Sequence, residues 1–168
     1  MIRLEKFDKG DYPLLINSIK DARELMQFAG PEFIFPLTEE QIEQSLSDKN
    51  RIAFSVVNVS NDSVIGHCEI CFKDSFANLG RILIMDQTLR GKGIGTQIVT
   101  LLLEFIIKNS EEKNVELNVF DFNSSAIKCY QKIGFVIHPD KKFVREMHNE
   151  TWTALNMRLN LDNWIRKD

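Results

Sequence analysis

One glycine-rich, basic segment offers the clearest chemistry in the sequence, and it reads Arg90-Gly91-Lys92-Gly93-Ile94-Gly95. It follows a stretch with strand character and precedes one with helical spacing, which places it at the start of a helix. Free backbone N–H groups and the positive end of the helix dipole converge at such a point and favour an anion. Glycines let a phosphate approach those donors, because no side chain intervenes. The segment therefore predicts a diphosphate-binding loop, to which Arg90 and Lys92 add positive charge.

Two other phosphate-binding motifs do not fit this loop. The dinucleotide fingerprint of parallel α/β sheets requires glycine where this chain has Thr96. The Walker loop requires serine or threonine directly after its Gly-Lys pair, whereas here Gly93 follows Lys92. A glycine-rich connection that binds no ligand is the remaining alternative.

The spacing of Cys68 and Cys71 could suggest a metal or redox site. Both cysteines, however, lie in residues 64–72, a β-branched and aromatic stretch typical of a strand. Residues three apart in a strand point to opposite faces, so the two thiolates could not easily share a metal. Cys129 stands alone in the sequence. We therefore expect no metal site.

The composition is that of an ordinary globular protein. Of 168 residues, 43% are hydrophobic and 27% are charged, which suits one domain over residues 1–168 with a buried core. A net charge of -3 weighs against a nucleic-acid partner and mildly favours a cationic substrate. There is no signal-peptide pattern and no apolar run of about 18 residues, and three cysteines suit a reducing compartment. We expect a cytoplasmic protein that binds no membrane.

The N-terminal third predicts one short strand and two helices. Apolar and polar residues alternate over residues 2–4, as in a strand. A proline in the first turn and a glycine-proline stop delimit one helix over residues 12–29, in which Ile19 and Ala22 keep the helical spacing. A capping-box pattern that begins at Thr38 predicts a second helix.

The rest of the chain predicts a mixed sheet. Residues 52–59 and 64–72 are joined by a polar turn and indicate a hairpin, which a strand over residues 79–86 extends. Two helices and two further strands follow, at residues 93–108 (helix), 115–120 (strand), 124–133 (helix) and 152–159 (strand). Because strand-helix-strand crossovers favour parallel pairing, the expected fold class is α/β (α+β), with a central, mostly antiparallel mixed sheet flanked by helices.

Two segments resemble a known family. The loop from Arg90 to Gly95 resembles the acetyl-CoA signature of the GNAT N-acetyltransferases, glutamine or arginine, any two residues, glycine, any residue, then glycine or alanine. The segment from Asn123 to Phe135 resembles their second motif, in which asparagine opens a helix that carries a tyrosine and closes on Gly-Phe. The runs over residues 90–96 and 129–135 are most similar to the ribosomal-protein N-terminal acetyltransferase-like subgroup. The order of elements extends the resemblance to nearly the whole chain.

The resemblance implies an acyl-CoA N-acyltransferase fold whose sheet is splayed at the cofactor site. Acetyl-CoA would be the acetyl donor, with its diphosphate held by the backbone from Arg90 to Thr96 and its pantetheine arm between two separated strands. Leu83 and Met85 would offer backbone groups to that arm. Asn123 would contact the arm from the other side.

Acetyl transfer to an amine needs a route for removing the amine's proton, a donor to the oxyanion and an acid for the departing thiolate. By resemblance, Tyr130 is the candidate acid, and a tyrosine that only packs is the alternative. Many relatives carry a glutamate on the strand before the loop, where this chain has Arg81 and no glutamate. Glu69 on the adjacent strand is the candidate base, directly or through water, although an exposed strand carboxylate is the simpler interpretation. His67 and His138 are further alternatives.

The acceptor should be recognised by residues 28–38 and 138–150, two segments that we interpret as loops. The main hypothesis is direct transfer of acetyl, in a ternary complex, to a primary amine of a small molecule or a polypeptide N-terminus. The protein would act as a monomer or homodimer. A catalytically weak acetyl-CoA-binding sensor is the first alternative, and a nucleotide-binding module is the second.

Overall fold

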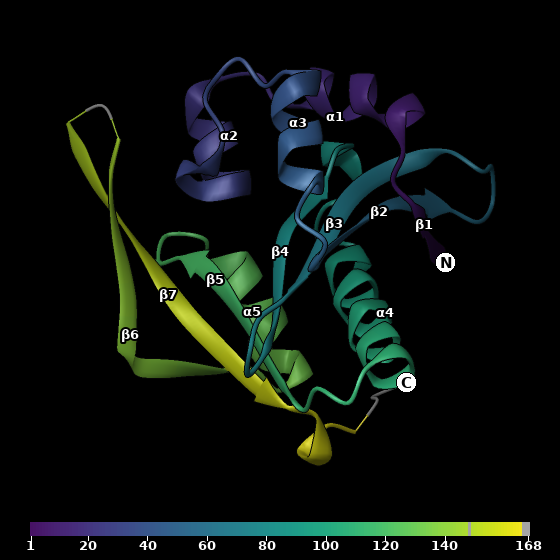
Figure 1. The fold of residues 1–168 in the computed structure, drawn as a ribbon. Coiled ribbons are helices and arrows are strands. Elements are labelled where there is room, and N and C mark those ends of the chain that lie inside the picture. The colour runs from purple at the N-terminus through teal and green to yellow at the C-terminus, as the bar shows by residue number, and fades with distance from the viewer. Residues whose placement is uncertain (148, 166–168) are drawn as a thin grey trace.

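The computed structural model describes residues 1–147 and 149–165. Within these residues, seven strands form one sheet in the order β1-β2-β3-β4-β5-β7-β6 (Figure 1). The strands are β1 (Ile2–Lys6), β2 (Arg51–Asn58), β3 (Val64–Phe72), β4 (Ala77–Ile84), β5 (Asn114–Phe120), β6 (Val136–Met147) and β7 (Glu150–Asn160). Neighbouring strands are antiparallel except β4 and β5, which are parallel. The predicted mixed, mostly antiparallel sheet is confirmed.

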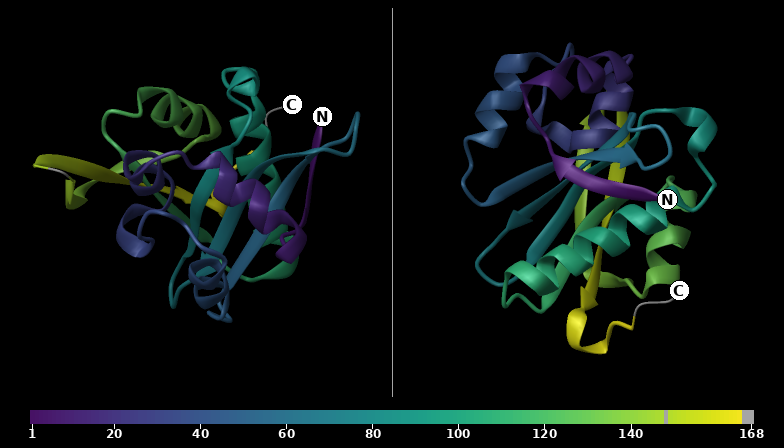
Figure 2. Two further views of the ribbon diagram at one scale, coloured as in Figure 1. Left: turned by 90° about the horizontal axis from the view of Figure 1, so that it is seen from above. Right: turned by 90° about the vertical axis from the view of Figure 1, so that its right-hand side faces the viewer.

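Helices cover both faces of the sheet (Figure 2). The α-helices are α1 (Tyr12–Ser18), α2 (Ala22–Ala29), α3 (Glu39–Leu46), α4 (Ile94–Asn109) and α5 (Ser124–Ile133). Helices α1 to α3 lie on one face, and α4 and α5 lie on the other. No helix in the described ranges is long and apolar enough to cross a membrane.

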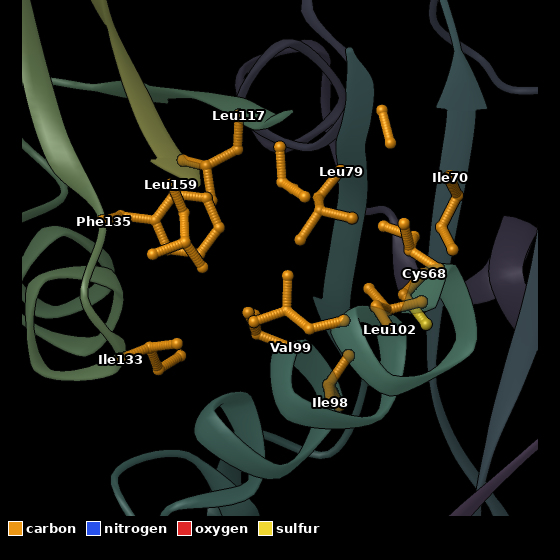
Figure 3. Packing of buried hydrophobic residues seen from close by; sticks show 14 of the residues in the cluster. Cys68, Ile70, Leu79, Ile98, Val99, Leu102, Leu117, Ile133, Phe135 and Leu159 are labelled. Carbon is orange, nitrogen blue, oxygen red and sulfur yellow. The ribbon is translucent and has the colours of Figure 1, made fainter. Parts of the chain in front are cut away.

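The main core lies between the sheet and helices α4 and α5. Apolar residues of α4 recur at helical spacing, and Ile98, Val99 and Leu102 are fully buried. They pack toward Leu79 and Leu117 of the two parallel strands (Figure 3). A second apolar cluster fills the space between the other face and helices α1 to α3. The two parallel strands are thus packed against α4.

The predicted helix over residues 12–29 is two helices. The chain is extended at Ile19 (φ -99°, ψ 112°), and the Asp21 side chain accepts a hydrogen bond at 2.8 Å from the Glu24 N–H at the start of α2. An aspartate in this position is a strong N-cap. The apolar spacing continues through the break because both helices bury the same face, so periodicity alone did not reveal the end of α1.

The interpretation of residues 138–150 as a loop is wrong, because most of them belong to strand β6 and the beginning of β7. Pairing with β7 runs from Val136 to Met147, with an irregularity between Ile137 and Lys142. β6 is an edge strand on which exposed and half-buried side chains alternate. The apolar alternation that indicates a strand is therefore weak. His148 lies outside the described residues.

Candidate active site

Strands β4 and β5 are paired at one end only. Their ladder joins residues 77–79 to residues 115–117, after which the two strands diverge (Figure 1). The backbone of β4 from Gly80 onward therefore has no ladder partner on the β5 side. This is the predicted splay of the sheet, and it leaves strand N–H and C=O groups available to a ligand.

A β-bulge marks the beginning of the splay. The β3–β4 register shifts between His67 and Glu69, and Arg81 opposite has a left-handed backbone (φ 49°). The extra residue keeps Ile82 in the main core and turns Leu83 toward helices α1 to α3. Left-handed backbone is unusual for arginine, and such strain is typical of functional sites.

Two cavities meet at the splay. The loop cavity, of about 600 Å³, is lined by the glycine loop and by residues of α2, β4 and α5. The sheet cavity, of about 290 Å³, lies between the diverging strands and the segment after α2. The residues that line both are Gln27, Phe28, Ile82, Asn123 and Tyr130. A molecule bound along the glycine loop could therefore reach a second molecule in the sheet cavity.

The structure places the glycine loop where the sequence predicted it, directly before α4. Gly91 (φ 75°) and Gly93 (φ 80°) have left-handed backbones, which glycine adopts without strain, and the space beside both is open. The guanidinium of Arg90 donates a hydrogen bond to the Ile84 carbonyl at 3.1 Å and braces the loop against β4. Lys92 and Ile94 do not line the cavity, since Lys92 is exposed and Ile94 packs on the main core.

Helix α5 contributes basic residues that the sequence analysis missed. Lys128 and Lys132 line the loop cavity together with Ser125. Their spacing of four residues puts both lysines on one face of the helix. That spacing was the available signal. The positive charge predicted for the loop therefore comes from Arg90 and from α5.

The other predicted cofactor residues differ in their availability. Leu83 lines the loop cavity, but Met85 does not, and its N–H already donates to the Ile65 carbonyl at 2.9 Å. The Thr96 hydroxyl lies 3.3 Å from Cys129 Sγ and links α4 to α5. Asn123 caps α5, because its side chain accepts a hydrogen bond from the Ala126 N–H at 3.3 Å. The Met85 N–H is thus unsuited to the predicted hydrogen bond with pantetheine.

Tyr130 lies where the two cavities meet, as the candidate acid should. It is half-buried and its ring packs edge-on against Phe135, with the ring centroids 6.1 Å apart. Within the described ranges, its hydroxyl has no hydrogen-bond partner. Burial raises the pKa of Tyr130, and the neighbouring Cys129 adds to the shift. The hydroxyl therefore stays protonated at neutral pH and is available as a hydrogen-bond donor.

Glu69 is not the exposed strand carboxylate that the sequence suggested, since its residue is 3% exposed. Its oxygens bind Arg51 Nη1 at 2.6 Å and Arg81 Nη1 at 3.1 Å, and His67 Nε2 lies 3.0 Å from Oε1. Burial alone would raise the pKa of Glu69, but the hydrogen bond from His67 and the charges of Arg81 and Arg51 outweigh it and lower the pKa to about 2. Such a carboxylate is a poor proton acceptor.

Neither Glu69 nor the two alternative histidines reach the reaction space. Glu69, His67 and His138 line neither the loop cavity nor the sheet cavity. His67 is fully buried and its ring packs against Phe7 and Phe28. The structure thus does not bring the suggested base together with Tyr130.

Replacement of Glu69 by glutamine should lower the free energy of unfolding by about 3 kcal/mol, because two buried guanidiniums lose their shared counter-charge. Urea unfolding at pH 7 measures this. The folded-state pKa lies below the ordinary value of 4.5, so the carboxylate stabilises the fold above pH 4.5. That contribution disappears as the pH falls from 4.5 to about 2, and the difference between wild type and variant should shrink with it.

The matched control is Glu43→Gln. Glu43 pairs with Lys9 on the surface, where both side chains are largely exposed, and such pairs contribute about 0–1 kcal/mol. Equal stability of the Glu69 and Glu43 variants would show that the buried cluster does not support the fold.

Known proteins share this architecture. A spermidine N-acetyltransferase from Vibrio cholerae, solved in complex with CoA and spermine, superposes with a TM-score of 0.77 over 96% of each chain at 21% identity. At this level of identity, the similarity shows that the two proteins share a fold.

Two curated relatives match parts of the sequence. The SPbeta prophage-derived uncharacterized N-acetyltransferase YokL of Bacillus subtilis is 26% identical over 99 residues, 58% of this chain and 54% of its own length. The aminoglycoside N(6')-acetyltransferase type 1 of Klebsiella pneumoniae is 34% identical over 53 residues, 32% of this chain and 26% of its own length. The matches thus span about half of these relatives or less.

The narrower resemblance to the ribosomal-protein N-terminal acetyltransferase-like subgroup finds no support in these relatives. The broader resemblance to the GNAT family is supported. The sequence profile of the acetyltransferase (GNAT) family matches residues 19–135, which include the glycine loop, the splayed strands and Tyr130. This chain therefore belongs to the acetyltransferase (GNAT) family.

Proposed function

We propose that the protein is an N-acetyltransferase, acting as a single domain, that transfers acetyl from acetyl-CoA to a primary amine. The observation that carries this proposal is the meeting of the loop cavity and the sheet cavity at Ile82, Asn123 and Tyr130. A donor bound along the glycine loop would present its thioester to an amine in the sheet cavity. The volume of about 290 Å³ suits a small-molecule acceptor better than a polypeptide N-terminus.

The residues present fit the diphosphate and pantetheine of acetyl-CoA. The open space beside Gly91 and Gly93 gives a diphosphate access to the backbone N–H groups before α4. Arg90, Lys128 and Lys132 supply positive charge around that point. The unpaired backbone of β4 beyond Leu79 can bind the amide groups of pantetheine as an additional strand would.

Tyr130 is the proposed acid for the transfer. The amine nitrogen forms a bond to the thioester carbonyl carbon and loses a proton to solvent water, the carbon–sulfur bond breaks, and the thiolate takes a proton. A tyrosine hydroxyl that stays protonated and lies between the two cavities is placed to supply that proton. A proton donor at this position supports catalysis over binding alone.

An amine panel with a free-thiol readout tests the proposed function. We expect acetyl-CoA to release CoA thiol in an amine-dependent manner, with a matching acetylated product by mass spectrometry. Tight acetyl-CoA binding with no amine-dependent turnover across the panel would instead favour the sensor alternative. ATP or NAD raising the melting temperature more than CoA would favour the nucleotide-binding alternative.

A further inference from the structure

The wall of the sheet cavity is strongly cationic for a protein with a net charge of -3. Among the described residues that line it, the charged side chains are Arg51, Lys73, Arg81, Arg145 and Glu32. Four of these are cations and one is a carboxylate. The net charge of the whole chain favoured a cationic substrate. The positive charge of the cavity wall instead favours a substrate that carries a negative group.

Two of the four cations are already compensated. Arg51 and Arg81 share the buried Glu69 beneath the cavity, and the Glu32 carboxylate contacts both guanidiniums, with Arg51 Nη2 at 3.5 Å. The Arg81 guanidinium also lies over the Phe33 ring, 4.0 Å from its centroid. Two arginines and two carboxylates cancel, so this part of the wall is close to neutral.

The other two cations, Lys73 and Arg145, have no ion pair within the described part of the chain. Lys73 is exposed directly after β3, whereas Arg145 is half-buried on β6. Lys73 follows Phe72, at the end of the sheet where β4 and β5 are paired, whereas Arg145 pairs with Trp152 beyond the splayed end, so the two cations lie at opposite ends of the cavity. Arg145 Nη1 donates to the Val144 carbonyl at 3.1 Å, which leaves further guanidinium N–H groups for a ligand.

We propose that the acceptor is a small amine that also carries a carboxylate, and that Arg145 binds this carboxylate. This inference rests on the proposed function and names its substrate class. The amine end then points to Ile82 and Tyr130, where the two cavities meet. A carboxylate removed from water next to an unpaired guanidinium gains charge-assisted hydrogen bonds. A polyamine without a carboxylate brings only like charge to the same wall.

Matched pairs of amines that differ only by the carboxylate give the test. L-Ornithine is compared with putrescine, and L-lysine with cadaverine, at a fixed saturating concentration of acetyl-CoA. We expect kcat/KM to be at least about 10-fold higher for the amino acid of each pair, as for one hydrogen bond to a charged group. Equal or faster acetylation of the diamines, or of spermidine, would overturn the inference.

Variants of the two cations locate the effect. Arg145→Gln should lower kcat/KM for L-ornithine by about 10-fold while leaving the value for putrescine unchanged or raised, whereas Lys73→Gln, at the far end of the cavity, should leave both values unchanged. Lys142→Gln is the charge-matched control, because Lys142 is exposed on the same strand β6 and does not line the cavity. An unchanged ratio between the two acceptors in Arg145→Gln would contradict the assignment.

A binding measurement separates this inference from the proposed function. Calorimetric titrations of L-ornithine and putrescine into protein saturated with CoA require no turnover. Tighter binding of L-ornithine, lost in Arg145→Gln, would sustain the inference even if no amine is acetylated and the proposed function falls. Equal or tighter binding of putrescine would overturn the inference even if the protein is an active acetyltransferase.

Discussion

Replacement of Gly95 by glutamate is expected to weaken CoA binding by at least about 100-fold while the protein stays folded. Gly95 lies in the first turn of α4 and lines the loop cavity. A glutamate there places a carboxylate beside the proposed position of the diphosphate and covers the backbone donors that would bind it. A 100-fold loss corresponds to about 2.7 kcal/mol of binding free energy, a plausible cost for bringing two anions together.

The matched control for this substitution is Gly95→Ala. A Cβ atom at Gly95 would meet Cys129 Sγ at 3.7 Å, an ordinary van der Waals contact, so alanine fits without displacement. Its CoA affinity should stay within about 10-fold of wild type, less than the loss expected for glutamate. Calorimetry gives the affinities and circular dichroism checks the fold. If folded Gly95→Glu binds CoA as wild type does, the loop is not the diphosphate site.

Replacement of Tyr130 by phenylalanine is expected to slow the acetyl-transfer step by about 100-fold, the lower part of the range for general acid catalysis. The ring and its packing on Phe135 remain, so acetyl-CoA affinity and stability should change little. Only the hydroxyl that can protonate the thiolate is lost. Single-turnover transfer with enzyme in excess measures the step directly, because product release does not limit it.

The chain contains one other tyrosine, which provides the control. Tyr12 is buried against Phe7 in the second apolar cluster and lines neither cavity. Tyr12→Phe should therefore leave the transfer rate unchanged. Equal single-turnover rates for wild type and Tyr130→Phe, at equal acetyl-CoA affinity, would make Tyr130 a packing residue.

The parts of the fold that were predictable depend on local signals. Gly91 and Gly93 mark the loop because the left-handed backbone there favours glycine, whatever the rest of the chain does. Helix α5 has the predicted bounds since Asn123 caps its start and Gly134, with a positive φ of 123°, ends it. In both cases, the residues that determine the backbone conformation lie within a few positions of it in the sequence.

The environment of Glu69 could not be predicted in this way. Its partners Arg51 and Arg81 come from the two strands that flank β3, so the cluster exists only after the sheet forms. Sequence alternation indicates which face of a strand a residue occupies but not which helix covers it. The bulge at Arg81 adds one residue to β4, so the residues after it point to the opposite face from the one that alternation predicts.

The charge of the sheet cavity is a further property of the assembled structure. Lys73 follows β3, whereas Arg145 lies on β6, an edge strand without a clear apolar alternation. In the sequence, both residues resemble ordinary surface charge. The order of the strands, with β7 between β5 and β6, brings both residues to one cavity.

Amide hydrogen exchange with and without saturating CoA tests the central claim most directly. Backbone N–H groups in the first turn of a helix lack intrahelical partners and exchange readily, so a bound diphosphate should protect them. We expect slower exchange at residues 91–96 and at residues 80–84 of β4, with no change along β6. Saturating CoA binding that leaves both segments unprotected would contradict this site.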